Sequence, residues 1–256
     1  MKPMRNKLND TLTDLRLIKD SQGLSELLLS LEREGCSPTE AFCQGLELIA
    51  NNRGQKKKAT WMTTARFPSW ANLVTFDPKL CCVPAKKLEE LMDLQWLARG
   101  ENLYLNGPTG LGKSLLAVVL GKRAVLAGYR TFFIEEKAMN ERFLEKLNDP
   151  AAYKRQVQHY ISQDLLIIDD VGRVGDRTSG FCDVLHERHG QTKSTIITSN
   201  FLISEWRCAA EICSDLVPSS ERFLERAHNL RYHGKSLRLE AFKKRNSKPT
   251  PTLTSS

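Results

Sequence analysis

Residues 107–114 carry the pattern that most restricts the fold of this chain, Gly-Pro-Thr-Gly-Leu-Gly-Lys-Ser, which fits G-x-x-x-x-G-K-[ST]. An apolar run at 102–106 precedes it and predicts a buried strand, and residues 114–126 have apolar side chains at helical spacing. A strand, a glycine-rich loop and a helix N-terminus point backbone N–H groups and the positive end of the helix dipole at one place. Because a polyanion satisfies such a place well, the segment predicts a phosphate-binding loop. A purely structural glycine-rich turn is the alternative.

The side chains of this loop predict how a nucleoside triphosphate binds. Lys113 has the position from which an ammonium group reaches the β- and γ-phosphates, and the Ser114 hydroxyl can ligate Mg²⁺. The expected cofactors are therefore ATP and Mg²⁺. The expected nucleotide-binding residues are Gly107, Pro108, Thr109, Gly110, Leu111, Gly112, Lys113, Ser114 and Leu115.

Strand and helix patterns alternate from about residue 71 onward. Helical spacing is found at 88–97 and over the charged stretch 136–162, which is broken near Asp149-Pro150. Strands separated by helices indicate a parallel sheet with helices on both faces and ligands at the carboxyl ends of the strands. The expected fold class is α/β, with strands at 102–106, 131–135, 164–168, 194–199 and, more weakly, 229–233.

Polar residues follow two of these predicted strands. Asp169 and Asp170 come directly after four aliphatic residues; Asp169 is expected to hold Mg²⁺, and Asp170 to polarise the water that attacks the γ-phosphate. Asn200 follows the run 194–199, and its amide could orient that water or sense the γ-phosphate. Taken singly, an Asp pair could cap a helix and an Asn could close a turn. Together with the phosphate-binding loop they predict a hydrolytic site.

Arginines beyond Asn200 supply candidates for a further catalytic group. Phosphoryl transfer is accelerated when a cation reaches the γ-phosphate from a neighbouring subunit. Composition does not choose among the four candidates, and a surface ion pair is the alternative role of each. They are Arg207, Arg222, Arg226 and Arg238.

Composition restricts the compartment. The chain has 256 residues with 41% apolar and 27% charged side chains, which suits a globular protein with one large and one small domain. No apolar run approaches the ~20 residues that cross a bilayer, and residues 1–10 lack the apolar stretch of a secretory signal. We therefore expect a cytoplasmic protein without a membrane partner. Seven cysteines without a C-x-x-C pair indicate reduced thiols rather than a zinc site.

The net charge of +8 is unevenly distributed. Residues 221–256 hold nine Lys/Arg against three Glu, and a second basic run lies at 53–58. Such patches suit the phosphate backbone of a nucleic acid, because each contact adds affinity without reading sequence. A solvated basic tail is the alternative.

Leucines at helical spacing predict three short amphipathic helices within residues 5–50. Gly35-Cys-Ser37 interrupts the pattern, and Ser37-Pro-Thr-Glu40 has the form of a helix start. The polar stretch 51–58 is a linker candidate. The expected domains are a helical partner- or DNA-binding domain at 1–58, a linker at 59–70, an ATPase domain at 71–240 and a basic, disordered tail at 241–256.

The order of these motifs resembles that of the AAA+ ATPases. More narrowly, the chain resembles the IstB-like transposition helper ATPases, which are relatives of the DnaC-type helicase loaders. The resemblance covers roughly residues 70–240. It is carried by 99–114 (RGENLYLNGPTGLGKS), 165–172 (LLIIDDVG), 195–200 (TIITSN), Ser204-Glu-Trp206 and 234–238 (GKSLR).

The resemblance implies an ASCE-type α/β sheet with ATP bound between neighbouring subunits of a homo-oligomer on duplex DNA. Lys113 and Ser114 then form Walker A, Asp169 and Asp170 form Walker B, and Asn200 is sensor 1. Arg222 falls where the family has Leu-Asp-Arg-Leu and is the implied arginine finger, although Ser-Glu-Arg-Phe departs from that pattern. About 18 residues follow Arg238, so little or no C-terminal lid is expected.

The function implied is a Mg²⁺-dependent ATPase that oligomerises on double-stranded DNA and recruits or activates a transposase at target DNA. A DnaC-like loader of a replicative helicase is the main alternative, since both use this ATPase core. A P-loop small-molecule kinase and a DNA-binding scaffold with an inactive ATP site are two further alternatives.

Overall fold

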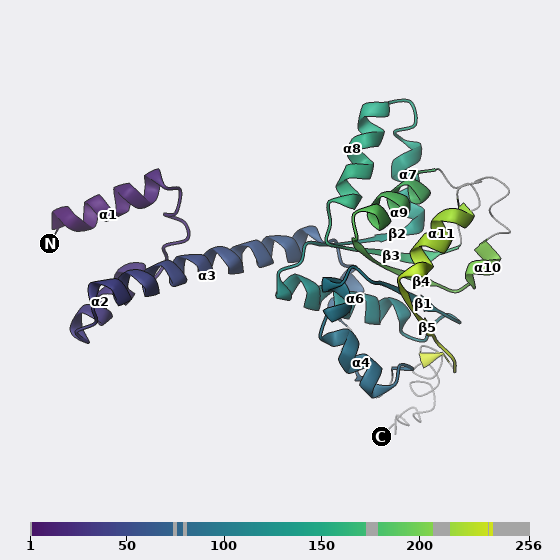
Figure 1. Ribbon diagram of the computed structural model, residues 1–256, viewed down its shortest axis with the longest axis horizontal. Coiled ribbons are helices and arrows are strands. Elements are labelled where there is room, and N and C mark those ends of the chain that lie inside the picture. Colours follow the sequence, from purple (N-terminus) through teal and green to yellow (C-terminus); the bar gives the residue numbers. More distant parts are fainter. Residues whose placement is uncertain are drawn as a thin grey trace, which may run out of the picture. The chain divides into compact units, whose positions relative to one another are not determined.

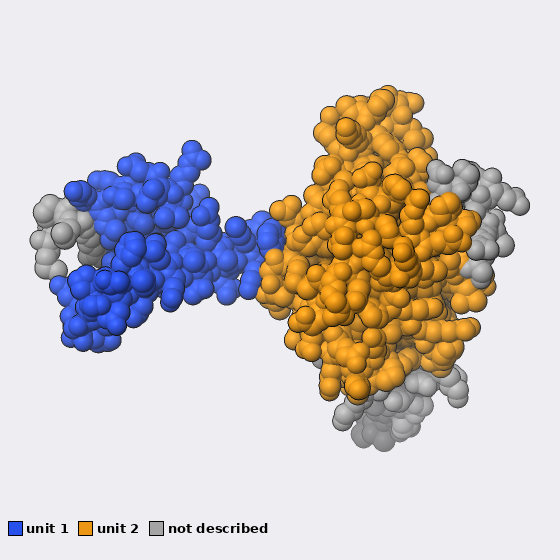
Figure 2. Space-filling view, in the orientation of Figure 1, with its two compact units in different colours: residues 1–61 blue, residues 62–256 orange. Residues whose placement is uncertain are grey.

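The computed structural model describes residues 2–73, 76–78, 81–172, 179–206, 216–234 and 236–237. The chain divides into two compact units, residues 1–61 and residues 62–256 (Figure 2). Arg207, Arg238 and the tail 241–256, all singled out in the sequence, lie outside the described residues.

The first unit is built from α1 (Lys2–Asp14), α2 (Leu24–Arg33) and the first part of α3 (Pro38–Thr64), which confirms the three predicted helices. Leu12, Leu24 and Ile49, one from each helix, form its small core. The predicted start of α3 is also confirmed. Glu40 Oε2 accepts a hydrogen bond from the Ser37 backbone N–H at 3.0 Å, and the Glu40 N–H donates to Ser37 Oγ at 3.3 Å.

The polar stretch 51–58, which the sequence suggested as a linker, is instead helical and belongs to α3. Its polar side chains bind the turn between α1 and α2. Asn52 Nδ2 donates to the carbonyls of Asp20 and Gln22, both at 2.9 Å, and Lys56 Nζ lies 3.2 Å from Asp20 Oδ1. The sequence suggested a linker because residues 51–58 are polar. The partners of these polar side chains lie some thirty residues earlier in the chain, so the sequence did not reveal them.

The second unit contains a five-stranded parallel sheet with the order β2-β3-β4-β1-β5. All five predicted strands are present, the third extended at its carboxyl end and the fifth displaced by two residues. The displacement follows from pairing, because the fifth strand lies beside the first over its whole length, with Asn102 opposite Ala227. The strands are β1 (Asn102–Asn106), β2 (Thr131–Glu135), β3 (Leu165–Val171), β4 (Ser194–Ser199) and β5 (Ala227–Arg231).

Helices cover both faces of this sheet, as expected for strands that are buried on both sides (Figure 1). Alternate residues of each strand serve the two faces: Leu103 and Leu105 pack toward α6, whereas Tyr104 packs on the opposite side. One face carries α4 (Ala85–Met92), α5 (Gln95–Ala98) and α6 (Lys113–Ala127). The other carries α7 (Glu136–Leu144), α8 (Pro150–Ile161), α9 (Gly180–Gly190) and α11 (Leu216–Glu225).

Two boundaries between helices have clear local causes. The helix predicted over 88–97 is divided into α4 and α5, because Leu94 adopts the left-handed conformation with φ of 60°. The predicted break at 149–150 is confirmed: Asp149 caps α8 by accepting a hydrogen bond from the Ala152 N–H at 2.9 Å, and Pro150 occupies the first turn. The described residues of this unit also include two four-residue helices, η1 (Ser69–Asn72) and α10 (Ile203–Trp206). In the described parts of the chain, no helix has the length and apolar character of a membrane span.

Candidate nucleotide-binding site

The carboxyl ends of three neighbouring strands bring the predicted site residues to one edge of the sheet. β4 lies between β1 and β3, so Asn200 follows the strand that separates the glycine-rich loop from the two aspartates. Register supports this placement, since Asn106 is opposite Ser199 and Ile168 is opposite Ile197. The structure therefore brings the loop, the Asp pair and Asn200 together. The sequence had predicted only that each of them follows a strand.

The glycine-rich loop closes tightly on one side and stays open on the other. A Cβ on Gly107, whose φ is 133°, would lie 2.4 Å from the Tyr232 carbonyl oxygen, so the loop packs directly on the chain that leaves β5. Gly112 has φ of 85° and immediately precedes α6, and a Cβ built there meets nothing within 4 Å. The 15-residue helix α6 thus begins beside open space. An anion in that space would face the positive end of the helix dipole.

The Lys113 side chain is buried at this edge of the sheet, and its ammonium group donates hydrogen bonds to three oxygens. Nζ donates to the carbonyls of Gly107 and Pro108 at 2.7 and 2.8 Å, and to Asn200 Oδ1 at 2.9 Å. An ammonium group has three hydrogens. Lys113 is thus held across the loop by contacts that phosphate oxygens could replace.

Asn200 connects Lys113 to Asp170. Its Nδ2 donates to Asp170 Oδ1 at 2.8 Å, while its Oδ1 accepts from Lys113. Asp170 lies in a bulge of β3, where the register with β4 shifts, and it adopts φ of 58°. The bulge re-aims the side chain that strand alternation would otherwise point elsewhere. The result is a continuous chain of polar contacts from the ammonium group to a carboxylate.

Asp169 is 8% exposed and lies next to Ser114. Burial raises the pKa of its carboxyl, and the nearby Asp170 charge acts in the same direction, against the hydrogen bonds from Thr198 and Ser114 and the Lys113 charge. A carboxylate beside a hydroxyl is the donor set that Mg²⁺ takes when phosphate and water complete its shell. Within the residues that the structure describes, no three His, Cys, Asp or Glu side chains gather as a metal cage.

Two residues to which the sequence assigned no role also belong to this edge of the sheet. Thr198 Oγ1 donates to Asp169 Oδ1 and accepts from the Asp170 backbone N–H at 3.0 Å. Glu136, buried at the start of α7, accepts a hydrogen bond from the Gly172 N–H at 2.7 Å. The sequence placed Thr198 near the end of the predicted strand 194–199, and Glu136 directly after the predicted strand 131–135. It did not reveal their partners.

Two described arginine candidates do not join this group. Arg226 Nη2 donates to the His189 carbonyl at 3.1 Å, and Arg222 is the other. It is exposed on α11, and its guanidinium contacts His186 of α9 at the rim of a groove of about 680 Å³ between α8, α9 and α11. Within one chain, then, the implied finger does not approach the glycine-rich loop.

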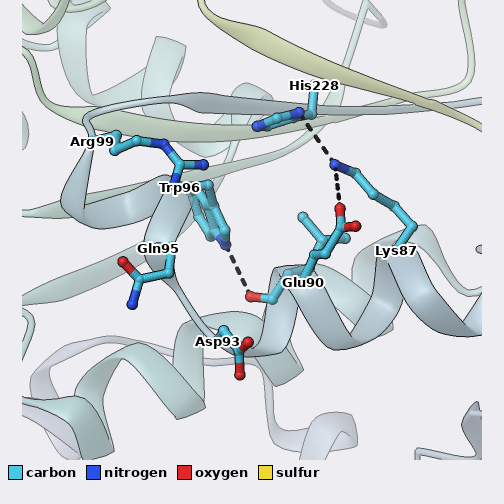
Figure 3. A pocket seen from close by; sticks show the side chains of 8 residues that line it. Lys87, Glu90, Asp93, Gln95, Trp96, Arg99 and His228 are labelled. Atoms are coloured by element: carbon cyan, nitrogen blue, oxygen red, sulfur yellow. Dashed lines mark hydrogen bonds and ion pairs between the residues drawn. The ribbon is translucent and has the colours of Figure 1, made fainter.

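A second cavity, of about 270 Å³, lies at the opposite edge of the sheet, beside the start of β5 (Figure 3). Several of its polar groups are already paired: Lys87 Nζ is 3.1 Å from Glu90 Oε2, and His228 Nε2 is 2.7 Å from Glu101 Oε2. The amino ends of the strands, where it lies, are not where parallel α/β sheets bind nucleotides. This cavity is therefore not part of the candidate site.

The fold and this edge of the sheet define a P-loop nucleotide-binding protein of the AAA+ class. The family model for IstB-like ATP binding proteins matches residues 13–246, and the chain belongs to that family. This membership confirms the resemblance seen in the motifs.

Relatives agree with this membership, and a solved structure agrees with the fold. The chain is 28% identical over 250 residues to the ATP-binding protein of insertion sequence IS21 from Pseudomonas aeruginosa, covering 93% of this chain and 91% of that protein. It is 26% identical over 242 residues to that of insertion sequence IS5376 from Geobacillus stearothermophilus, covering 92% and 95%. The crystal structure of DnaI matches with a TM-score of 0.52 at 16% identity, covering 65% of this chain and 94% of DnaI, which concerns the fold alone.

Proposed function

We propose that this protein is a Mg²⁺-dependent ATPase that oligomerises on double-stranded DNA and recruits or activates a transposase at target DNA. The observation that carries the catalytic part is the chain of contacts from Lys113 through Asn200 to Asp170. The names of the relatives, ATP-binding proteins of insertion sequences, support the link to transposition.

In this proposal the loop residues 107–115 bind the phosphates through backbone N–H groups, and Lys113 exchanges its contacts with the two loop carbonyls and with Asn200 Oδ1 for phosphate oxygens. Ser114 and Asp169 would hold Mg²⁺, which supplies charge neutralisation at the β- and γ-phosphates. Because Lys113 also holds Asn200, the exchange changes what Asn200 contacts. Occupancy of the phosphate site is thereby transmitted to the hydrolytic carboxylate.

Asp170 and Asn200 would then position the attacking water. Asp170 is only partly buried, and its carboxylate is fixed by the Asn200 amide at 2.8 Å. A fixed acceptor orients a water molecule for in-line attack without a further conformational change. The short acid suits slow turnover, as expected of a timer rather than a motor.

Arg222 would act on the γ-phosphate of a neighbouring subunit, which requires a homo-oligomer. Its exposure on α11 and its distance in the fold from its own loop suit a role between subunits. The net charge of +8 supports DNA as the surface of assembly. We assign partner or DNA binding to residues 1–58 and ATP hydrolysis to 71–240, joined through 59–70.

The ATP-dependent part is tested with Lys113→Ala in the full-length protein. Lys122→Ala is a matched control, because Lys122 lies on the same helix but donates to Ala71 and Asn72. We expect Lys113→Ala to lose ATP binding and ATP-dependent assembly on duplex DNA, measured by fluorescent-nucleotide titration and electron microscopy, while Lys122→Ala retains both. Unchanged assembly of Lys113→Ala would contradict the proposal.

The partner is tested by capture. Full-length protein is mixed with the transposase of its own insertion sequence or with the host replicative helicase, each with ATP and DNA. Retention of the transposase supports the proposal, whereas retention of the helicase alone favours the DnaC-like alternative. Phosphate release in the same mixtures separates an active ATPase from a DNA-binding scaffold.

A further inference from the structure

Where β3 and β4 approach the candidate site, hydrogen bonds made by side-chain hydroxyls of β4 join the two strands. Backbone pairing runs regularly to Ile168 opposite Ile197 and resumes with Val171 opposite Ser199. Between these two pairs β3 has one residue more than β4. Across this gap Thr198 Oγ1 accepts the Asp170 N–H at 3.0 Å, and Ser199 Oγ donates to the Val171 carbonyl at 2.6 Å. The bulge that carries both aspartates is thus held by β4 side chains.

Thr198 has a double contact in this arrangement. Its hydroxyl has a single hydrogen, which it donates to Asp169 Oδ1, and its lone pair accepts the backbone N–H of Asp170. The residue is 1% exposed, so water cannot replace either contact. One oxygen atom therefore sets the direction of the Asp169 carboxylate and the place of the Asp170 peptide at once.

We infer that Thr198 is a positioning residue that couples the Mg²⁺-binding carboxylate of Asp169 to the water-orienting carboxylate of Asp170. The inference rests on the proposed ATPase function and deepens it. A carboxylate held at one oxygen presents its other oxygen in a fixed direction. Precise placement of both ligand and base matters, because displacements near 1 Å can cost about 100-fold in rate.

The chain offers variants that separate hydroxyl from shape. Thr198→Val keeps the β-branched volume but removes the hydroxyl, whereas Thr198→Ser keeps the hydroxyl. Thr195→Val is the matched control: Thr195 is equally buried on the same strand, but its Oγ1 accepts from Arg188 Nε at 3.0 Å, away from the aspartates. Thr198→Ala replaces Thr198→Val if the latter does not fold.

The experiment measures two quantities in the full-length protein. The first is the affinity for a non-hydrolysable ATP analogue with Mg²⁺ and with EDTA; the second is kcat for ATP hydrolysis. We expect the increase in analogue affinity that Mg²⁺ provides to be about 10-fold smaller in Thr198→Val than in wild type. We expect kcat of Thr198→Val to be about 100-fold lower. Thr198→Ser and Thr195→Val should each stay within about threefold of wild type in both.

The outcomes distinguish this inference from the proposed function. If folded Thr198→Val matches wild type in both quantities, or if Thr195→Val loses as much, Thr198 does not couple the two aspartates and the inference is overturned. Wild-type protein that binds the analogue but fails to hydrolyse ATP overturns the proposed ATPase instead. In that case a Mg²⁺ effect lost in Thr198→Val and kept in Thr198→Ser still supports the link from Thr198 to Asp169.

Discussion

Replacing Arg188 tests how the sheet that carries the site is held together. Arg188 lies on α9, is 1% exposed, and extends across the amino ends of β3 and β4. Its guanidinium donates to the carbonyls of Tyr160 and Gln163, each at 2.8 Å, and also to the Ser194 carbonyl. The fork of a guanidinium satisfies several buried acceptors that no other side chain could reach together.

Two opposing energies decide the effect of Arg188→Met. Burial lowers the pKa of the Arg188 guanidinium to about 9, so folding carries a desolvation cost that an apolar side chain would remove. Against this, Arg188→Met leaves several buried carbonyls without a donor, at about 1–3 kcal/mol each. We therefore expect a net loss of about 4 kcal/mol.

Urea unfolding, followed by circular dichroism, measures this loss directly. A loss of about 4 kcal/mol corresponds to a fall of about 8–16 °C in Tm for a domain of this size. Arg188→Lys should lose somewhat less, because its ammonium group reaches only some of the acceptors. A loss below about 1 kcal/mol in Arg188→Met would refute the reasoning, since desolvation would then cancel the hydrogen bonds.

Three further predictions concern the site and its surroundings. Asn200→Leu should lower kcat about 100-fold with little change in nucleotide affinity, measured by phosphate release and nucleotide titration. Arg99 beside Glu101 lowers the pKa of that carboxyl from 4.5 to about 2, so its stabilising contribution is complete above pH 4.5 and is lost toward pH 2. The free energies of unfolding of wild type and Glu101→Gln should therefore become equal as the pH falls through this range. Mixing inactive Arg222→Ala with inactive Asp170→Asn should restore activity if the two residues act in different subunits.

The sequence predicted much of the fold because its signals are local. The first four strands were visible as largely apolar runs, the start of α3 as Ser37 and Glu40 three residues apart, and the loop as a glycine pattern. The fifth strand was visible only weakly, because few of its residues are apolar. These features depend on neighbours within a few residues. The polar stretch 51–58 was misread for the opposite reason, since its helix is stabilised by contacts with the turn at 20–22.

The sequence by itself determined which chemical groups this protein carries, that Asp169, Asp170 and Asn200 stand at strand ends, and that Lys113 stands where the glycine-rich loop meets a helix. Only the tertiary structure decided what they touch. The order β3-β4-β1 inserts Asn200 between Lys113 and Asp170, and the bulge in β3 brings both aspartates to Thr198. Strand order and register join residues from 28 to 87 positions apart, and no periodicity within the sequence encodes those distances. The same structure placed Arg222 on α11 beside His186 of α9, apart from the contacts that join Lys113, Asn200 and Asp170.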